Sequence, residues 1–312
     1  MLSRRMALPL AWLVGLLVVA PMRGAEPAKD IPKNQEKPSA RYLRLVRDKS
    51  GQPTALATSV VRLAPQGHGR TGPTVDLIAA VHVGDKTYYA QLNRLFEKYD
   101  AVLYELVAPV GTRVPKGGGG RSNHPVSAIQ RLMSDVLELQ FQLEGIDYQR
   151  GNMIHADMSP DEFAKSMRSR GESVWSLMFR MMGYAMARQS ADGGGSSDVR
   201  LLMALFDKNQ ALALKRVMAE QFEDFEGSLL AIEGPQGSTL IAERNKVALG
   251  VLRRQIAAGN RKLAIFYGGG HMPDFEKRLR ADFGLIRASE RWLTAWDLRD
   301  KTKSPTAGGG AN

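Results

Sequence analysis

Apolar and polar positions follow the same order in two separate stretches of the chain. In the first, a mostly apolar run at residues 74–83 (TVDLIAAVHV) precedes residues 86–99, where apolar positions recur at helical spacing. A second apolar run, AVLYELV at residues 101–107, closes this stretch. Period-3.6 patterning between two short apolar runs predicts a strand, a helix and a strand, and a unit of this length is typical of a parallel or mixed sheet.

The second stretch repeats this layout near the end of the chain. We expect a strand at residues 262–267, a helix at 273–283 and a strand at 285–298. Each unit places a histidine, His82 or His271, close to the end of its first strand. The sequence therefore predicts an α/β fold with a mixed central sheet, built from two pseudo-symmetric strand–His–helix–strand units with an inserted helical region.

The rest of the chain adds an N-terminal hairpin and a helical insertion to these two units. Residues 41–63 alternate like two strands around the turn SGQP and predict an opening hairpin. We expect one domain over residues 41–300, with the helical insertion at about 125–258. The candidate helices there lie at residues 125–143, 160–169, 172–189, 198–206, 209–225 and 239–258.

The first 25 residues have the layout of a secretory signal. Arg4 and Arg5 precede an uncharged, mostly apolar run at residues 6–20, and small residues follow at Gly24 and Ala25. We expect residues 26–40 to form a linker and residues 301–312 a disordered tail. The protein is then exported, to the periplasm or outside the cell, and an uncleaved leader would hold it at the membrane by its N-terminus.

Charge and cysteine content remove several classes of function. The net charge is +11, from 43 Lys and Arg against 32 Asp and Glu, but the basic residues are spread along the chain. Nucleic-acid binding favours a basic patch interleaved with aromatic residues, so we exclude nucleic acid as a partner. The chain has no cysteine, which excludes disulfides, a lipoprotein anchor and cysteine chemistry. The oligomeric state is left open.

The candidate chemistry centres on His82, Glu105 and His271. In an open α/β sheet, ligands bind beyond the carboxyl ends of the strands, where both histidines are expected. Glu105 is a charged residue within an apolar strand, and a buried carboxylate needs a partner or a cation. Two imidazoles and one carboxylate leave a coordination position open, as in catalytic sites for a divalent metal ion. Mn, Co and Zn all suit such a set.

These segments resemble the TraB/TIKI superfamily, also called TraB/GumN proteins, which carries two Gly-x-x-His motifs and a characteristic glutamate. Gly268-Gly269-Gly270-His271 matches the second motif, and Glu105 matches the glutamate. The first motif departs from the pattern, because Ala79 stands where the family often has Gly. Glu243-Arg244-Asn245 resembles the polar cluster of a family helix. The resemblance runs from about residue 74 to 296.

The resemblance implies a metal-dependent hydrolase, and animal members are described as membrane-tethered peptidases. We expect His82 and His271 to bind the metal, and Glu105 to be the third ligand or the base that takes a proton from water. Arg244 would stabilise an oxyanion or hold Glu105 in place. Asn245 would orient the substrate or belong to polar packing. The expected substrate is a peptide or a small molecule.

Six further residues are candidates for substrate binding. His155 and Asp157 follow a short β-like stretch, although a helix-start signature at Ser159-Pro160 also suggests that Asp157 is a capping residue. The others belong to the motifs already described: Gly268, Gly269, Gly270 and Glu243.

Two other functions fit the same sequence. Distant relatives of the family include haem-binding lipoproteins, and the Met-rich residues 175–186 are either a core face or an apolar wall for such a ligand. A protein that binds haem or another metal-centred ligand is therefore one alternative. A non-catalytic protein that sequesters a peptide is the other.

Overall fold

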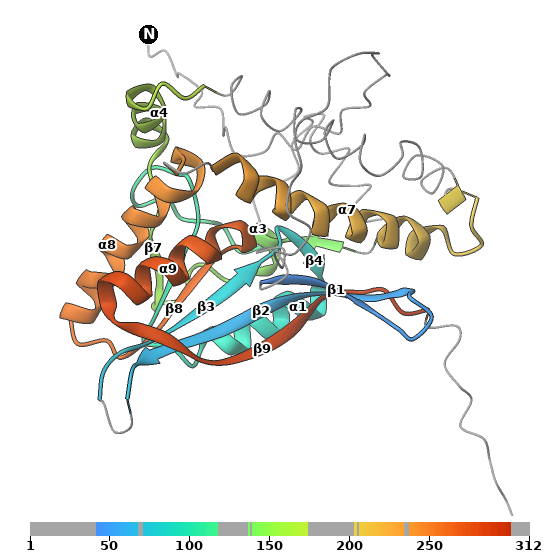
Figure 1. Ribbon diagram of the computed structural model, residues 1–312, viewed down its shortest axis with the longest axis horizontal. Coiled ribbons are helices and arrows are strands. Elements are labelled where there is room, and N and C mark those ends of the chain that lie inside the picture. The colour runs from blue at the N-terminus through green and yellow to red at the C-terminus, as the bar shows by residue number, and fades with distance from the viewer. Residues whose placement is uncertain are drawn as a thin grey trace, which may run out of the picture.

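The structure of the chain is a computed structural model that describes residues 42–67, 71–117, 137, 139–173, 203–204, 206–233 and 237–300 (Figure 1). The expected leader, linker and C-terminal tail lie outside these residues, as does the Met-rich segment 175–186. The described residues contain both predicted strand–His–helix–strand units.

A mixed sheet forms the centre of the protein, as the sequence predicts, and it has seven strands. Strands β3, β8, β5 and β7 run parallel to one another in this order. The antiparallel part is built on β2, which pairs with β1 and β3 and, along most of its length, with β9. A separate ribbon pairs β4 with β6. The strands are β1 (Leu43–Arg47), β2 (Pro53–Pro65), β3 (Thr74–Ala80), β4 (Val83–Asp85), β5 (Ala101–Tyr104), β6 (Leu139–Phe141), β7 (Met153–His155), β8 (Lys262–Gly268) and β9 (Leu285–Asp297).

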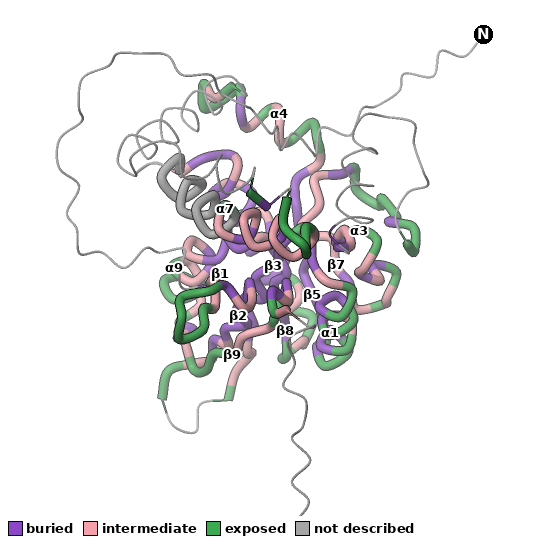
Figure 2. The backbone as a smooth tube through the Cα atoms, turned by 90° about the vertical axis from the view of Figure 1, so that its right-hand side faces the viewer, coloured by how far each residue is buried: buried purple, intermediate pink, exposed green. Residues whose placement is uncertain are grey.

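Helices cover both faces of the sheet because successive side chains of a strand point to opposite sides. In β3, Leu77 and Ala79 pack with the apolar faces of α8 (Arg244–Ala257) and α9 (Met272–Phe283). Ile78 and Ala80 pack with α1 (Lys86–Phe96) on the other face. Figure 2 shows these strands buried at the centre, between helices whose outer sides are exposed.

The remaining helices lie around the end of the sheet where the parallel strands stop. Helix α7 (Gln210–Glu233) contacts β1 and the two short helical turns η3 (Thr239–Glu243) and η4 (Gly269–His271). It lies along the upper side of the sheet in Figure 1. Two shorter helices complete the described set: α3 (Gln142–Gly145) and α4 (Pro160–Ser169).

Several predicted elements differ from those observed. The helix predicted at residues 125–143 is wrong at its end, where β6 pairs with β4 instead, so long-range backbone pairing prevails over local helical pattern. The helix predicted at 239–258 is divided into the π-helical turn η3 and α8. The prediction at 160–169 is confirmed as α4. The helices predicted at 172–189 and 198–206 lie mostly outside the described residues.

The two predicted units begin alike and end differently. The first strands, β3 and β8, lie side by side and parallel, and each is followed by a histidine and a helix. The closing strands differ, because β5 pairs with β8 in parallel whereas β9 returns antiparallel to β2. No helix within the described part of the chain is both long and apolar enough to cross a membrane.

Candidate active site

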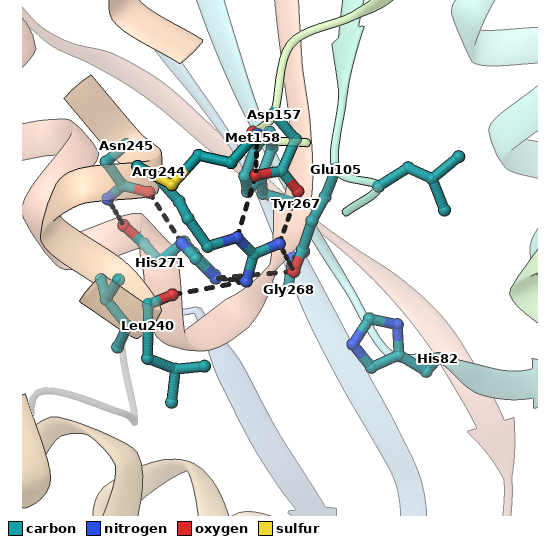
Figure 3. Close-up of polar contacts among 12 residues, drawn as sticks. His82, Glu105, Asp157, Met158, Leu240, Arg244, Asn245, Tyr267, Gly268 and His271 are labelled. Atoms are coloured by element: carbon teal, nitrogen blue, oxygen red, sulfur yellow. Dashed lines mark hydrogen bonds and ion pairs between the residues drawn. The ribbon is translucent and has the colours of Figure 1, made fainter. Parts of the chain in front are cut away.

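The ends of three neighbouring parallel strands bring the candidate residues together. Ala80 at the end of β3 pairs with Gly268 at the end of β8, and Tyr104 at the end of β5 pairs with Phe266. His82, Glu105 and His271 lie just beyond these ends, in the part of the fold where α/β proteins form their sites. Figure 3 shows Glu105 between His82 on one side and the Arg244–His271 cluster on the other.

Glu105 is held as an ionised carboxylate. It follows the last residue of β5, so the prediction that it lies within the strand is corrected by one position, although its backbone N–H still donates to Phe266 O at 3.2 Å. Its Oε1 accepts from Arg244 Nη2 at 2.7 Å, and its Oε2 accepts from the backbone N–H of Gly268 at 2.7 Å. Burial alone would raise its pKa, but Arg244, the two histidines and the Gly268 N–H hold the pKa well below its usual range.

Arg244 has an acceptor for every N–H of its guanidinium group. Nε donates to Asp157 Oδ1 at 2.9 Å, and Nη2 donates to Asp157 Oδ2 at 2.6 Å and to Glu105 Oε1 at 2.7 Å. Nη1 donates to Leu240 O at 3.3 Å and lies 3.4 Å from His271 Nε2. Burial lowers the pKa of Arg244, but the two carboxylates raise it overall, so the group stays charged. Because its five donors are all engaged, Arg244 holds Glu105 in place and has no N–H left for an oxyanion.

Asn245 determines which nitrogen of His271 carries the hydrogen. Its Nδ2 donates to His271 O at 3.1 Å and to Asp274 Oδ2 at 2.9 Å. Both partners are acceptors, so the amide oxygen must be the atom that faces His271 Nδ1, at 2.7 Å. An amide oxygen only accepts, and Nδ1 therefore carries the hydrogen and Nε2 the lone pair. That Nε2 lies 3.6 Å from Glu105 Oε1.

His271 is neutral at physiological pH. Its burial lowers its pKa, Glu105 opposes this, Arg244 lowers the pKa further, and the result is a pKa of about 4. The lone pair on Nε2 faces Arg244 Nη1 at 3.4 Å, and once this long contact is released it can accept a proton or bind a metal ion. Asn245 thus orients His271, and the structure places it in contact with this ring.

His82 is exposed, and Gln142 contacts it at two points. Its Nδ1 lies 3.2 Å from Gln142 Oε1, and its backbone oxygen accepts from Gln142 N at 2.8 Å. Gln142 is buried, and its Nε2 donates to Tyr148 OH at 2.9 Å. The sequence analysis missed Gln142, because residues 139–143 alternate apolar and polar and Gln142 has the same pattern as the neighbouring Gln140.

Gly268 leaves an opening that all three groups face. A Cβ added there would lie 3.4 Å from Glu105 Oε2, 3.8 Å from His82 Nε2 and 3.9 Å from His271 Cδ2. Any larger residue would fill this space, so the glycine permits close approach of a ligand. Gly269 and Gly270 are buried and form the helical turn η4 that leads to His271.

Three further candidates have structural contacts. Asp157 is buried and forms the two-point ion pair with Arg244. It does not cap α4, because the cap is Ser159, in a capping box with Glu162. His155 Nε2 lies 2.6 Å from Leu106 O, beside Tyr104. The described partners of Glu243 are Arg170 at 3.2 Å and Lys246 at 2.8 Å.

The site thus joins most of the predicted residues in one network. His82, Glu105 and His271 lie around the opening at Gly268, Arg244 holds Glu105, Asn245 holds His271, and Asp157 holds Arg244. Among the described residues, the hydrogen bonds and ion pairs of His155 and Glu243 do not reach this opening. Their predicted roles in substrate binding stay predictions.

Comparison of the chain with protein-family models, with curated proteins and with solved structures found no match in any of the three. The resemblance to the TraB/TIKI superfamily therefore stays a prediction that depends on the residues quoted for it. Among the residues that the structure describes, no group of three or more His, Asp or Glu side chains could hold a metal ion as placed. Fold and site define an α/β protein with a polar, partly buried cluster at the strand ends.

Proposed function

We propose that the protein is an exported, metal-dependent hydrolase that cleaves peptide or other amide bonds. One observation carries this proposal: a neutral imidazole, His271, presents Nε2 toward an ionised carboxylate, Glu105, beside an opening that His82 also faces. Export and the substrate class rest on the leader sequence and on the family resemblance. The positions of His271, Glu105 and His82 support the proposal of hydrolysis.

The donor atoms of His82, His271 and Glu105 are of the types that bind divalent metal ions. Two neutral imidazole nitrogens and an ionised carboxylate are ligands that Mn²⁺, Co²⁺ and Zn²⁺ accept. The 3.6 Å between His271 Nε2 and Glu105 Oε1 is close to the about 3.4 Å expected for two ligands of a tetrahedral ion with bonds of about 2.1 Å. His82 would have to move closer to complete the set.

Charge at the site favours a cation. Arg244 contributes one positive charge, and Asp157 and Glu105 contribute two negative charges, so the cluster keeps one net negative charge beside neutral His271. A bound ion would be held by His82, His271 and Glu105. When bound, such an ion supplies a strongly acidified water and polarises the carbonyl that is attacked.

The residues of the chain have separable tasks in this reaction. Glu105 has a second lone pair on each oxygen, with which it can bind the ion or accept a proton from water while Arg244 and Gly268 keep it oriented. Asn245 keeps the Nε2 of His271 unprotonated. Gly268 leaves room for the scissile group. Arg244 acts as a positioning residue, because its donors are already engaged.

Metal binding and hydrolysis by the purified protein test this proposal. We expect the wild type, loaded with Mn²⁺, Co²⁺ or Zn²⁺, to retain one equivalent by elemental analysis and to cleave members of a peptide library. His271→Ala and His82→Ala should lose the metal and the activity. His155→Ala is the matched control for metal binding, since His155 bonds Leu106 O, and it should retain the metal.

Two results would contradict the proposal. A wild type that binds none of the three ions would exclude the metal mechanism, and a loss of metal in His155→Ala as large as in His271→Ala would exclude the assigned site. A protein that binds peptides without cleaving them would instead support the sequestering alternative. A protein that binds haem would support the alternative that it is a haem-binding protein.

A further inference from the structure

Gln142 contacts His82 at two points. Its backbone N–H donates to His82 O at 2.8 Å, next to the β4–β6 ribbon in which Val83 pairs with Phe141. Its side-chain Oε1 lies 3.2 Å from His82 Nδ1. The main chain and the side chain of Gln142 together fix the imidazole ring of His82 relative to the backbone of His82. A ring that is otherwise exposed is thereby held by a buried amide.

Tyr148 holds the other end of this amide. Gln142 Nε2 donates to the Tyr148 hydroxyl oxygen at 2.9 Å, and Tyr148 is itself buried against Tyr104, with ring centroids 4.8 Å apart. With the amide nitrogen on Tyr148, the amide oxygen faces His82. An oxygen can only accept, so His82 Nδ1 must donate, and the lone pair of the neutral ring is then on Nε2.

His271 has the same arrangement on the other side of the opening. The amide oxygen of Asn245 binds its Nδ1 at 2.7 Å, and its Nε2 carries the lone pair. His82 Nε2 and the ring of His271 both lie within 4 Å of the position of a Cβ at Gly268. Two amide side chains from unrelated elements, α3 and α8, therefore orient two imidazoles toward one point.

We propose that Gln142 is a positioning residue that fixes His82 as the Nδ1–H tautomer, so that His82 presents an unprotonated Nε2 to the opening at Gly268, beside His271, whose lone pair is also on Nε2. The proposal rests on the proposed function only in taking this opening as the reaction site. The alternative is that the side-chain amide of Gln142 has the reverse orientation. With the amide reversed, Tyr148 would donate to Gln142, and His82 would carry its hydrogen on Nε2 and offer no lone pair there.

Nitrogen-15 NMR of the metal-free protein tests the tautomer directly. The two imidazole nitrogens of His82 are assigned by the loss of their signals in His82→Asn, and their shifts are read at about pH 8, where an unperturbed histidine is neutral. We expect the hydrogen on Nδ1 in the wild type. A hydrogen on Nε2 would overturn the proposal, and this measurement needs no variant at position 142.

Three variants separate the role of Gln142 from general packing. Gln142→Met keeps the length but removes the acceptor, and it should shift His82 toward the Nε2–H tautomer. Gln142→Glu still offers an acceptor and should keep the hydrogen on Nδ1. Gln140→Met is the matched control in the adjacent strand β6 and should change nothing. An unchanged tautomer in Gln142→Met would overturn the proposal.

The consequence for the site is measured separately. Loss of a residue that orients a metal ligand costs 10–100-fold in metal affinity or activity. We expect this loss in Gln142→Met, with recovery in Gln142→Glu. If the wild type binds no metal and hydrolyses nothing, the proposed function fails, but the tautomer result still stands, because it is obtained without metal or substrate.

Discussion

At the scale of single residues, the charged groups of the site are buried, so each of them needs a partner of opposite charge. Arg244 is buried together with Asp157, which binds its Nε and Nη2, and Glu105 binds Nη2 as well. Breaking such a pair by removing one partner leaves an uncompensated charge in a medium that solvates it poorly. The cluster should therefore be sensitive to the loss of any one member.

Replacement of Arg244 tests this balance. Arg244→Met leaves Asp157 and Glu105 without their cation, and we expect a loss of about 3–5 kcal/mol in the free energy of unfolding, measured with urea at neutral pH. Lys246→Met is the control, because Lys246 is 53% exposed and its ion pair with Glu243 should contribute less than about 1 kcal/mol. Equal losses in the two variants would show that the Arg244 cluster is solvated and not buried.

The low pKa of His271 predicts how stability depends on pH. The folded protein has a pKa of about 4 at this ring, whereas the unfolded chain has one of about 6.5. Between these values the unfolded state binds a proton that the folded state does not, so stability falls as pH decreases from about 6.5 to about 4. The contribution is on the order of 3 kcal/mol.

Glu105 acts in the same direction at lower pH. Its folded pKa lies well below its unfolded value, so it stabilises the fold above about pH 4.5 and loses this contribution as the pH falls further. Urea unfolding between pH 7 and pH 4.5 isolates His271. The slope should be flatter in His271→Gln than in the wild type, and parallel slopes would contradict the assignment.

At the scale of elements, two glycines in helices have opposite surroundings. Gly145 ends α3, the helix that carries Gln142, and a Cβ there would lie 2.5 Å from Tyr89 Cδ2. The Tyr89 ring cannot easily yield, because it is buried and its hydroxyl donates to Val81 O at 3.0 Å. Gly250 lies within α8, where a Cβ would meet only Arg254 Nη1 at 3.9 Å.

Substitution of both glycines by alanine should change stability in opposite directions. Gly145→Ala should cost about 1–3 kcal/mol through overpacking against Tyr89. Gly250→Ala should add about 0.5–1 kcal/mol, because alanine favours a helix interior. Thermal and urea unfolding of the two variants compare these effects. A stabilising Gly145→Ala would mean that α3 is not packed on α1.

At the scale of the whole molecule, the last strand closes the fold next to the site. Strand β9 returns to β2 near the beginning of the chain and buries Trp296, whose Nε1 donates to Val83 O at 2.7 Å. Val83 follows His82 directly. The C-terminal strand thus supports the loop that carries the first histidine, although it contributes no residue to the opening.

Two tryptophans of β9 test this support. Trp296→Ala should cost about 3–5 kcal/mol in unfolding free energy and should also weaken metal binding through the displaced His82 loop. Trp292→Ala is the control on the same strand. Trp292 is only half-buried, with Arg44 Cζ 4.0 Å from its ring centroid, and its loss should cost about 1 kcal/mol. Similar costs would contradict the supporting role of Trp296.

The sequence by itself determined the elements whose pattern is local. Period-2 and period-3.6 patterning predicted β3, β8, α4 and α9 because backbone geometry alternates side chains between a buried and an exposed side. The same patterning placed His82 and His271 near strand ends, but it placed Glu105 within a strand. What patterning could not place is the end of β5, since an apolar run continues past Tyr104 after its pairing has stopped.

Only the tertiary structure decided which polar groups meet. Gln142 and His82 are 60 residues apart in the chain, Asp157 and Arg244 are 87 apart, and Glu105 and Arg244 are 139 apart. It also decided that β9 joins β2 and that residues 139–141 form a strand. Local propensity contains no information about such pairings. They follow from the packing of distant elements and from the requirement that every buried charge and amide find a partner.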